Sequence, residues 1–290
     1  MLDPTLATPA VRRLIDLALE EDLGRGDVTT AAVIAPDTTA AAHLVTREPL
    51  VLAGLGVCTE VFLRVDATVR ATELAQDGQR VTAGTTVASY TGKAASLLAA
   101  ERTALNFVQR LSGTASLARA FVDAAAGSGL RITDTRKTTP GFRLLEKYAV
   151  RMGGASNHRH DLGSGVLIKD NHVAVAGGVR AAVERIRGQV PHGLKIEVEV
   201  DSLDQLEEAL AARADIVLLD NFGPADVERA VARVEKAVHR PLLEVSGGVS
   251  LQRISELGRA GVDLVSVGAL THSARAMDLG LDIVIGDRTT

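Results

Sequence analysis

The second half of the chain repeats one pattern, in which a short apolar segment ending in a polar residue or a glycine is followed by a segment with helical periodicity. Six apolar segments follow this pattern, at intervals of roughly 20 to 35 residues: 131–135, 166–170, 194–200, 215–220, 241–248 and 263–270. Strands that are apolar throughout and alternate with helices are typical of a parallel sheet covered by helices. Glycines at the ends of the last two strands favour an incomplete (β/α) barrel over an open doubly wound sheet.

The residues before this repeat predict a smaller, mixed region. Thr8 and Pro9 have the residue types that start a helix. Short apolar runs, among them 61–65, then alternate with turn signals, which indicates a small antiparallel sheet. Asp77-Gly78 is the best candidate for a hairpin turn in that sheet. The whole chain is therefore predicted to be an α/β protein.

Two helices are expected between the sheet and the barrel, at 94–111 and 115–126. In the first of them Arg102, Asn106 and Gln109 recur at helical spacing and form one polar stripe. From periodicity alone, this stripe is interpreted as a face exposed to solvent.

The composition excludes several kinds of protein. The net charge is −4, the isoelectric point is about 6.0, aromatic residues make up 2% and tryptophan is absent, so a nucleic-acid partner is not expected. The single Cys58 cannot form an internal disulfide, which is typical of a reducing compartment. No signal sequence and no stretch of about 18 apolar residues is present, so no membrane partner and a cytoplasmic location are expected.

Cationic side chains are concentrated between residues 131 and 173. They are Arg136, Lys137, Arg143, Lys147, Arg151, His158, Arg159, His160 and Lys169. In an acidic protein, this concentration indicates an anion site, with arginines suited to binding carboxylates. The alternative is that these cations pair with nearby acidic residues. A zinc site at the two histidines is not expected because no third imidazole or thiolate is near in sequence; His158 is interpreted as an added donor to an anion or as a structural residue.

In (β/α) barrels the chemistry lies at the carboxyl ends of the strands. Ser246, Gly247 and Gly248 follow the fifth strand and Gly268 follows the sixth, a pattern that favours a phosphate site at a helix start, with His272 able to contact the same phosphate. Other polar residues at these strand ends are Asp134, Thr135, Arg136, Lys137, Lys169, Asp170, Glu197, Glu199, Asp220 and Asn221.

Glu199 and Asp220 end two consecutive strands. Two carboxylates beside a phosphate site indicate Mg²⁺ that is held largely through water and phosphate oxygens. A lone aspartate at a strand end is more often a helix cap.

These motifs together resemble one known family. The segments that carry the resemblance are ERTALNFVQRLSGTAS, TRKTTPGFR, KYAVRMGGASNHRHDLGSGVLIKDNH, EVEV, LLDN, EVSGGV and SVGALTHS. In this order they resemble the quinolinate phosphoribosyltransferase family, over nearly the whole chain and including EDLGRGDVTT near the N-terminus.

The resemblance implies an N-terminal α/β sandwich domain at 1–112, an open, incomplete (β/α) barrel at 113–270 and a tail at 271–290 that returns to the sandwich. It implies a pentosyltransferase with carboxylating nicotinate-nucleotide pyrophosphorylase activity. The substrates would be quinolinate and 5-phosphoribosyl 1-pyrophosphate, the cofactor Mg²⁺, and the products nicotinate mononucleotide, pyrophosphate and CO2 in the synthesis of NAD. The family forms homodimers, and a further assembly of dimers is left open.

The resemblance also implies roles for individual residues. Those expected to bind quinolinate are Arg136, His158, Arg159 and Lys169, with Arg102 supplied by the other subunit. Those expected to contact pyrophosphate and Mg²⁺ are Lys137, Glu199 and Asp220. Those expected to hold the 5-phosphate are Ser246, Gly247, Gly248, Gly268 and His272.

Two rival interpretations stay open from the sequence. One is a related phosphoribosyltransferase that acts on nicotinate or another carboxylated ring, although the cations outnumber what a monocarboxylate needs. The other is a non-catalytic relative, such as the homologue associated with molybdenum transport or a regulator that binds phosphosugars. Release of pyrophosphate in the presence of quinolinate would distinguish them.

Overall fold

The computed structural model describes residues 2–285, which form two compact units. The first unit contains residues up to 119, residues 138–154 and residues from 270 onward, and the second contains 120–137 and 155–269. Residues 138–154 thus lie with the first unit, whereas the sequence placed the start of the barrel at 113. The physical reason is that Leu145, Tyr148 and Ala149 are buried in the apolar core of the first unit.

The first unit is built on a four-stranded antiparallel sheet in the order β12-β1-β5-β3. The central strand β1 (Thr39–Thr46) pairs with β5 (Thr86–Lys93) and with the last strand, β12 (Leu279–Ile285). The edge strand β3 (Arg70–Glu73) pairs with β5. The C-terminal segment therefore returns to the sheet formed by the N-terminal part of the chain. Two further short strands pair with each other, β2 (Leu50–Val51) and β4 (Arg80–Val81).

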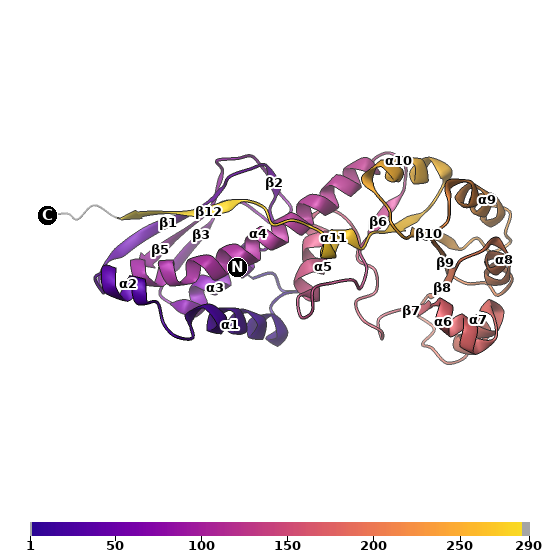
Figure 1. Ribbon diagram of the computed structural model, residues 1–290, viewed down its shortest axis with the longest axis horizontal. Coiled ribbons are helices and arrows are strands. Elements are labelled where there is room, and N and C mark those ends of the chain that lie inside the picture. Colours follow the sequence, from indigo (N-terminus) through magenta and orange to yellow (C-terminus); the bar gives the residue numbers. More distant parts are fainter. Residues whose placement is uncertain (1, 286–290) are drawn as a thin grey trace. The chain divides into compact units, whose positions relative to one another are not determined.

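Helices cover one face of this sheet (Figure 1). Thr8 caps the first helix by accepting a hydrogen bond from the Val11 amide, with proline in the first turn, which confirms the predicted start. Ile15, Val61 and Tyr90 are fully buried between the helices and the sheet. The helices that contribute to this unit are α1 (Pro9–Leu23), α2 (Val28–Val33), α3 (Leu55–Val65), α4 (Ala94–Ala124), α5 (Arg143–Met152) and the short α11 (Ala269–His272), of which α5 and α11 lie away from the sheet.

Two sequence predictions were wrong in the region around α3. Residues 61–65, predicted as a strand, belong to α3, where Val57, Cys58, Val61 and Phe62 are buried at helical spacing. The predicted hairpin at Asp77 does not form because β3 and β4 on its two sides belong to different sheets.

Asp77 instead caps α3. Its carboxylate accepts hydrogen bonds from the amides of Gly54 (2.9 Å) and Leu55 (3.0 Å). A cap supplied by a residue this distant in sequence gives no local signal, which is why sequence reasoning missed it.

The predicted break near residue 113 is also absent, and α4 is one continuous helix. Gly113 lies inside it, where a Cβ would come within 1.8 Å of the carbonyl oxygen of Arg275. The glycine therefore allows close packing of the C-terminal segment rather than a turn. Of the predicted polar stripe, Arg102 and Asn106 are exposed, but Gln109 donates a hydrogen bond to the Leu279 carbonyl (2.7 Å).

The second unit contains the six predicted strands in one parallel sheet of order β6-β11-β10-β9-β8-β7. The outermost strands β6 and β7 do not pair with each other in the part of the chain that the structure describes, so the barrel is open. The predicted fold class is confirmed. The strands are β6 (Arg131–Thr133), β7 (Val166–Ile168), β8 (Ile196–Val200), β9 (Ile216–Asp220), β10 (Leu242–Ser246) and β11 (Leu264–Ser266).

Helices lie along the outer side of this curved sheet (Figure 1). Four of them, α7 to α10, are amphipathic and bury an apolar side, as Val183, Leu206 and Ile254 illustrate. They are α6 (Asp170–Ala176), α7 (Val179–Arg187), α8 (Leu203–Ala211), α9 (Pro224–Val234) and α10 (Leu251–Ala260). Among the described residues, no helix is both long enough and apolar enough to cross a lipid bilayer.

Candidate active site

The ends of the barrel strands enclose a charged cavity of about 570 Å³ in the second unit. Every strand of the sheet ends in or just before residues that line it. The lining residues are Thr135, Arg136, Lys137, His158, Arg159, Leu167, Lys169, Glu199, Leu218, Asp220, Asn221, Ser246, Gly247, Gly248 and Ser266. Most of the site residues predicted from sequence are thus brought together at one place.

A second cavity of about 590 Å³ borders β7, α6 and α7 in the same unit. Its lining is mainly apolar, with Leu162, Val166 and Ile186 among its residues. Arg159 lines both cavities. The charged cavity is the better candidate for chemistry because it holds the titratable and cationic groups.

One side of the charged cavity is cationic. Arg136 and Lys137 follow β6, Arg159 comes from the loop before β7, and Lys169 follows β7. Arg159 donates a hydrogen bond to the carbonyl of Gly165 (3.2 Å). Burial and the neighbouring charge of Arg136 lower the pKa of the Arg159 guanidinium, while Glu197 opposes that shift. This concentration of positive charge suits a ligand with more than one carboxylate.

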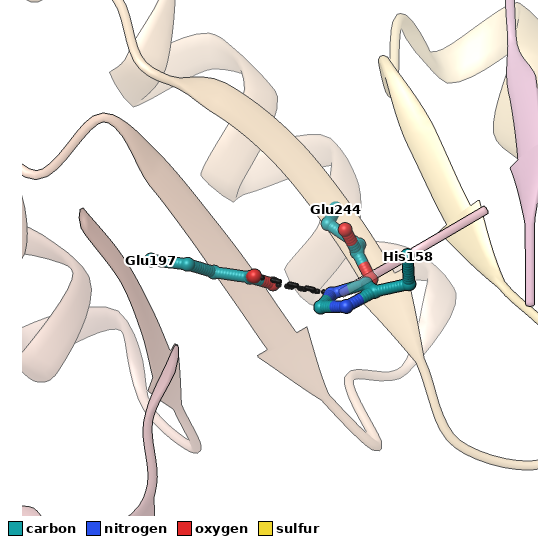
Figure 2. A group of neighbouring side chains, drawn as sticks. All are labelled: His158, Glu197 and Glu244. Atoms are coloured by element: carbon teal, nitrogen blue, oxygen red, sulfur yellow. Dashed lines mark hydrogen bonds and ion pairs between the residues drawn. The ribbon is translucent and has the colours of Figure 1, made fainter. Parts of the chain in front are cut away.

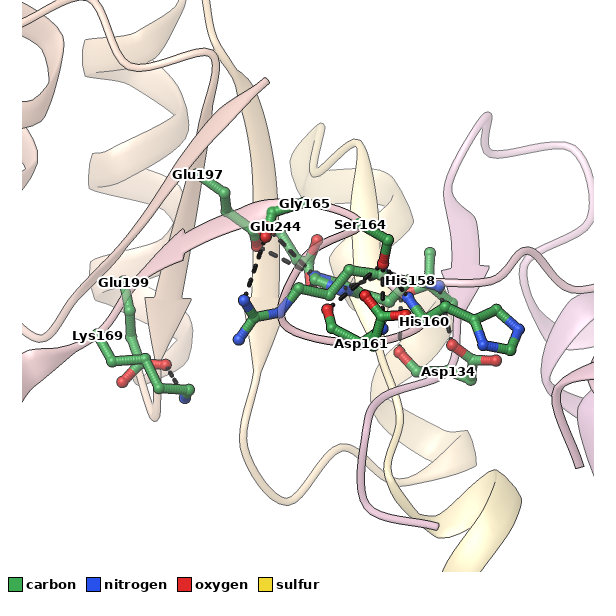
Figure 3. Close-up of polar contacts among 12 residues, drawn as sticks. Asp134, His158, His160, Asp161, Ser164, Gly165, Lys169, Glu197, Glu199 and Glu244 are labelled. Carbon is green, nitrogen blue, oxygen red and sulfur yellow. Dashed lines mark hydrogen bonds and ion pairs between the residues drawn. The ribbon is translucent and has the colours of Figure 1, made fainter. Parts of the chain in front are cut away.

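Two carboxylates, Glu199 and Asp220, line the same cavity. Lys169 Nζ donates to Glu199 Oε2 at 2.7 Å, a contact visible in Figure 3. Asp220 accepts a hydrogen bond from the Asn221 side chain at 2.9 Å. Lys169 therefore does pair with an acidic residue, Glu199 on the adjacent strand β8.

The two carboxylates fit a magnesium ion only in part. They supply hard oxygen ligands, and Lys169 would have to release Glu199 for both to bind the same ion. Two protein ligands would leave the remaining positions to water and phosphate oxygens, and the magnesium site stays a prediction.

The glycine turn after β10 forms the third part of the cavity. Gly247 and Gly248 have positive φ values of 95° and 55°, and a Cβ on Gly247 would lie 2.2 Å from Asn221 Oδ1. Ser250 then precedes α10. Backbone amides that face a cavity at a helix start are suited to a phosphate.

Gly268 and His272 are placed differently. Gly268 follows β11 but is not among the residues that line the cavity, although Ser266 on that strand is. His272 ends the short helix α11 and belongs to the first unit, where its Nδ1 contacts the Ser273 hydroxyl at 2.7 Å.

Arg102 lies in the first unit as an exposed residue of α4. It lines a small cavity of about 210 Å³ with Asn106, Arg110 and Phe142 among its other residues. Its predicted role in a neighbouring subunit stays a prediction.

His158 lines the charged cavity, and both of its ring nitrogens contact protein groups. The Arg159 amide donates to Nδ1 at 2.7 Å, and Nε2 lies 3.1 Å from Glu197 Oε2. The backbone amide of His158 donates to Asp134 Oδ1 at 2.8 Å, and the Asn157 side chain donates to Asp134 Oδ2 at 2.6 Å. The buried Asp134 therefore anchors the segment that carries the arginine and the histidine.

Sequence reasoning gave no role to the buried Glu244 on β10. Together with His158 and Glu197 it forms a cluster whose candidate ligand atoms lie within 4.8 Å of one another (Figure 2). The available signal was a single glutamate in an otherwise apolar strand segment, two residues before Ser246 and hence on the same face.

An open parallel barrel with cationic residues, two carboxylates and a glycine turn at its strand ends defines a class of enzyme that acts on phosphorylated, multiply anionic substrates. Residues 114–282 match the family described as "Quinolinate phosphoribosyl transferase, C-terminal domain", and residues 27–112 match its N-terminal domain. The chain belongs to the quinolinate phosphoribosyltransferase family.

Named relatives are similar along almost the whole chain. The nicotinate-nucleotide pyrophosphorylase [carboxylating] of Mycobacterium leprae is 46% identical over 279 residues, covering 94% of this chain and 97% of the relative. A probable enzyme of the same name from Bacillus subtilis is 37% identical, covering 96% and 95%. The crystal structure of NadC from Streptococcus pyogenes has a TM-score of 0.92 at 39% identity and covers 99% of both chains.

Proposed function

We propose that this protein transfers the phosphoribosyl group of 5-phosphoribosyl 1-pyrophosphate to quinolinate and releases CO2. The products are nicotinate mononucleotide and pyrophosphate, in the synthesis of NAD. The observation that carries the proposal is the single cavity that joins a cationic side to a glycine turn and two carboxylates. A dianionic ring and a phosphorylated sugar require such a combination.

Arg136, Arg159 and Lys169 bind the two carboxylates of quinolinate in this proposal. Lys169 exchanges its contact with Glu199 for a substrate carboxylate, which leaves Glu199 free to serve as a ligand of Mg²⁺ beside the pyrophosphate. Binding of one substrate thereby prepares the site for the other.

The glycine turn binds the 5-phosphate through the amides that follow Ser246, with Gly268 and His272 as further contributors. Lys137, which lines the cavity, contacts the pyrophosphate. Glu199 and Asp220 would hold Mg²⁺, which when bound neutralises charge on the pyrophosphate. These roles rest on the family resemblance together with the lining of one cavity.

The chemistry needs no protein nucleophile. As the bond between the anomeric carbon and pyrophosphate breaks, the ribose becomes oxocarbenium-like, and the quinolinate nitrogen attacks it. Lys137 stabilises the departing charge, and Arg136, Arg159 and Lys169, together called the clamp, hold the ring in line. The ribosylated nitrogen is positively charged, so it accepts the electron pair released when the adjacent carboxylate leaves as CO2, and a proton then replaces that group on the ring carbon.

We propose a homodimer in which Arg102 of one subunit reaches the quinolinate site of the other. The exposure of Arg102 on α4 supports this role, since a buried side chain could not serve a partner. We also place the enzyme in the cytoplasm, and the single cysteine of the sequence supports a reducing compartment.

One assay tests the activity directly. The purified protein is incubated with 5-phosphoribosyl 1-pyrophosphate, Mg²⁺ and quinolinate labelled in the carboxylate next to the ring nitrogen. Pyrophosphate and labelled CO2 should appear in equal amounts, and nicotinate should not replace quinolinate. Absence of pyrophosphate release, or release with nicotinate alone, would contradict the proposal.

A further inference from the structure

Two buried carboxylates lie beneath the charged cavity. Glu197 is 4% exposed and Glu244 is 1% exposed, and neither lines the cavity. Each precedes a cavity residue on the same face of its strand, Glu199 in β8 and Ser246 in β10. Burial of carboxylates in a sheet interior is unfavourable unless they are paired, so this position calls for a physical explanation.

The neighbours of these carboxylates on adjacent strands are mostly apolar. Glu197 is in register with Leu167 on β7 and Ile216 on β9. Glu244 is in register with Leu218 on β9 and Leu264 on β11. The polar partner that both carboxylates share is the ring of His158, as Figure 2 shows.

The hydrogen bonds of His158 define its tautomer. Because the Arg159 amide donates to Nδ1, that nitrogen carries no proton, and the proton of the neutral ring lies on Nε2. Nε2 then donates to Glu197, at 3.1 Å from Oε2, with Glu244 Oε1 at 3.8 Å. The ring thus connects the buried carboxylates to the backbone of Arg159.

The same geometry argues against a metal ion at this cluster. A metal would need the lone pair of Nε2, and the ring proton would then have to move to Nδ1. Nδ1 cannot carry a proton while it accepts the amide of Arg159. A proton-bearing Nε2 that faces the two carboxylates agrees with all of these contacts.

The two carboxylates differ in their surroundings. Glu244 Oε1 has no hydrogen-bond partner among residues 2–285, and burial together with the nearby Glu197 raises the pKa of Glu244 to about 7. Glu197 accepts from His158 and opposes the effect of burial and Arg136 on the Arg159 guanidinium. The Glu197 carboxylate therefore acts on the Arg159 guanidinium and favours its charged form.

We propose that Glu197 and Glu244 are positioning residues for the substrate clamp: through His158 they fix the backbone of Arg159, and the charge of Glu197 keeps its guanidinium in the cavity for a substrate carboxylate. The contact of Arg159 with the Gly165 carbonyl fixes the side chain at a second point. This inference rests on the proposed binding of quinolinate. It means that buried residues of the barrel strands help to position the clamp.

Four variants test this support by calorimetry with quinolinate and, separately, with 5-phosphoribosyl 1-pyrophosphate. Glu197→Gln keeps an acceptor for His158 but removes the charge, and we expect quinolinate affinity to fall about 10-fold. Glu197→Leu removes both the hydrogen-bond acceptor and the charge, and it should weaken quinolinate binding further. Glu244→Gln should recover much of the affinity that Glu244→Ala loses, because glutamine keeps the size of the side chain and a polar group beside the His158 ring.

Affinity for 5-phosphoribosyl 1-pyrophosphate should change less than twofold in Glu197→Gln. If Glu197→Gln loses affinity for both substrates to the same extent, the role of Glu197 is merely structural and the proposal is overturned. Glu228→Gln on the exposed side of α9 makes the same change of charge away from the cavity and serves as the control.

The tautomer gives an independent readout. Imidazole ¹⁵N spectra of the full chain should show His158 with a protonated Nε2 and an unprotonated Nδ1, the signal being assigned by its loss in His158→Gln. A proton on Nδ1 would contradict the network. If the wild-type protein does not bind quinolinate, the proposed function itself is wrong; if it binds and Glu197→Gln binds equally well, only the positioning role is wrong.

Discussion

Arg136, Arg159 and Lys169 are held in different ways, so their loss should have different consequences. Arg159 is fixed through its amide and through Gly165, and Lys169 is held by Glu199. Arg136 lies in the segment after β6 and lines the cavity. Replacement of Arg136 by alanine measures what one clamp arginine contributes to binding.

Arg136→Ala should weaken quinolinate binding by roughly 10- to 100-fold, since hydrogen bonds between charged groups contribute about 1.5–3 kcal/mol. The measurement is titration calorimetry, with the melting temperature as a check on folding. Arg131→Ala, at an exposed position of β6, is the control and should bind normally. Unchanged affinity in Arg136→Ala would remove this residue from the clamp.

Some residues of the site could be predicted from the sequence and others could not. Strand-end residues such as Lys169, Glu199 and Asp220 could be found because their position follows from the barrel pattern. The contact between Glu244 and His158 could not be predicted from sequence, because it depends on which side chains from distant segments meet inside the barrel. The hydrogen-bond direction at His158 also has no sequence signal.

Among the elements, α4 carries the least expected feature, a glycine that lies inside a long helix. Alanine at Gly113 would favour the helix by about 1 kcal/mol on propensity alone. A Cβ there, however, would lie 1.8 Å from the carbonyl oxygen of Arg275, which is backbone and cannot rotate away. The steric effect should therefore outweigh the propensity.

Gly113→Ala should lower the free energy of unfolding by about 1–3 kcal/mol, as expected for overpacking. Urea unfolding followed by circular dichroism measures this change. Gly188→Ala is a suitable comparison because a Cβ at Gly188 meets nothing within 4 Å and its φ is −83°. A Gly113→Ala protein as stable as the wild type would show that the C-terminal segment adjusts freely.

The C-terminal segment is also held by charge. Hydrogen bonds from Arg275 and from the Asp278 amide lower the pKa of Glu48 from 4.5 to about 2. A carboxyl whose pKa is lower in the folded state stabilises the fold at pH values above its unfolded pKa, and this contribution is lost as the pH falls from about 4.5 towards 2. Because Arg275 is 65% exposed, salt should screen part of the effect.

Glu48→Gln should therefore be less stable than the wild type at pH 7, and the difference in free energy of unfolding should narrow as the pH is lowered to 3. Urea titrations at both pH values measure it. Glu20→Gln, at an exposed position of α1, should show no such pH-dependent difference. If the difference in free energy of unfolding between wild type and Glu48→Gln is the same at pH 3 and pH 7, the ion pair does not account for the stabilisation.

At the scale of the whole molecule, the parallel barrel could be predicted because its strands are locally apolar and most of its helices are locally amphipathic. The antiparallel unit was harder to predict, since its order β12-β1-β5-β3 joins the two ends of the chain. The helix α3 was missed because Asp77, its cap, lies beyond its end in sequence. Pairings set by distant segments leave no periodic signal.

The proposed dimer makes the active site a property of two chains, and mixing two inactive variants tests it. Arg102→Ala lacks the residue supplied to the partner, and Lys169→Ala lacks a residue of its own cavity. In a hybrid dimer one site has both residues intact and the other has neither, so random exchange at equal amounts should restore about a quarter of the wild-type activity.

The measurement is pyrophosphate release after subunit exchange, with exchange itself verified by mass spectrometry of isotope-labelled chains. Arg102→Ala mixed with the double variant Arg102→Ala, Lys169→Ala is the control, because no chain in that mixture carries Arg102 and activity should stay absent. Recovery in the first mixture alone would assign Arg102 to the neighbouring site. No recovery despite proven exchange would mean that Arg102 acts within its own subunit or not at all.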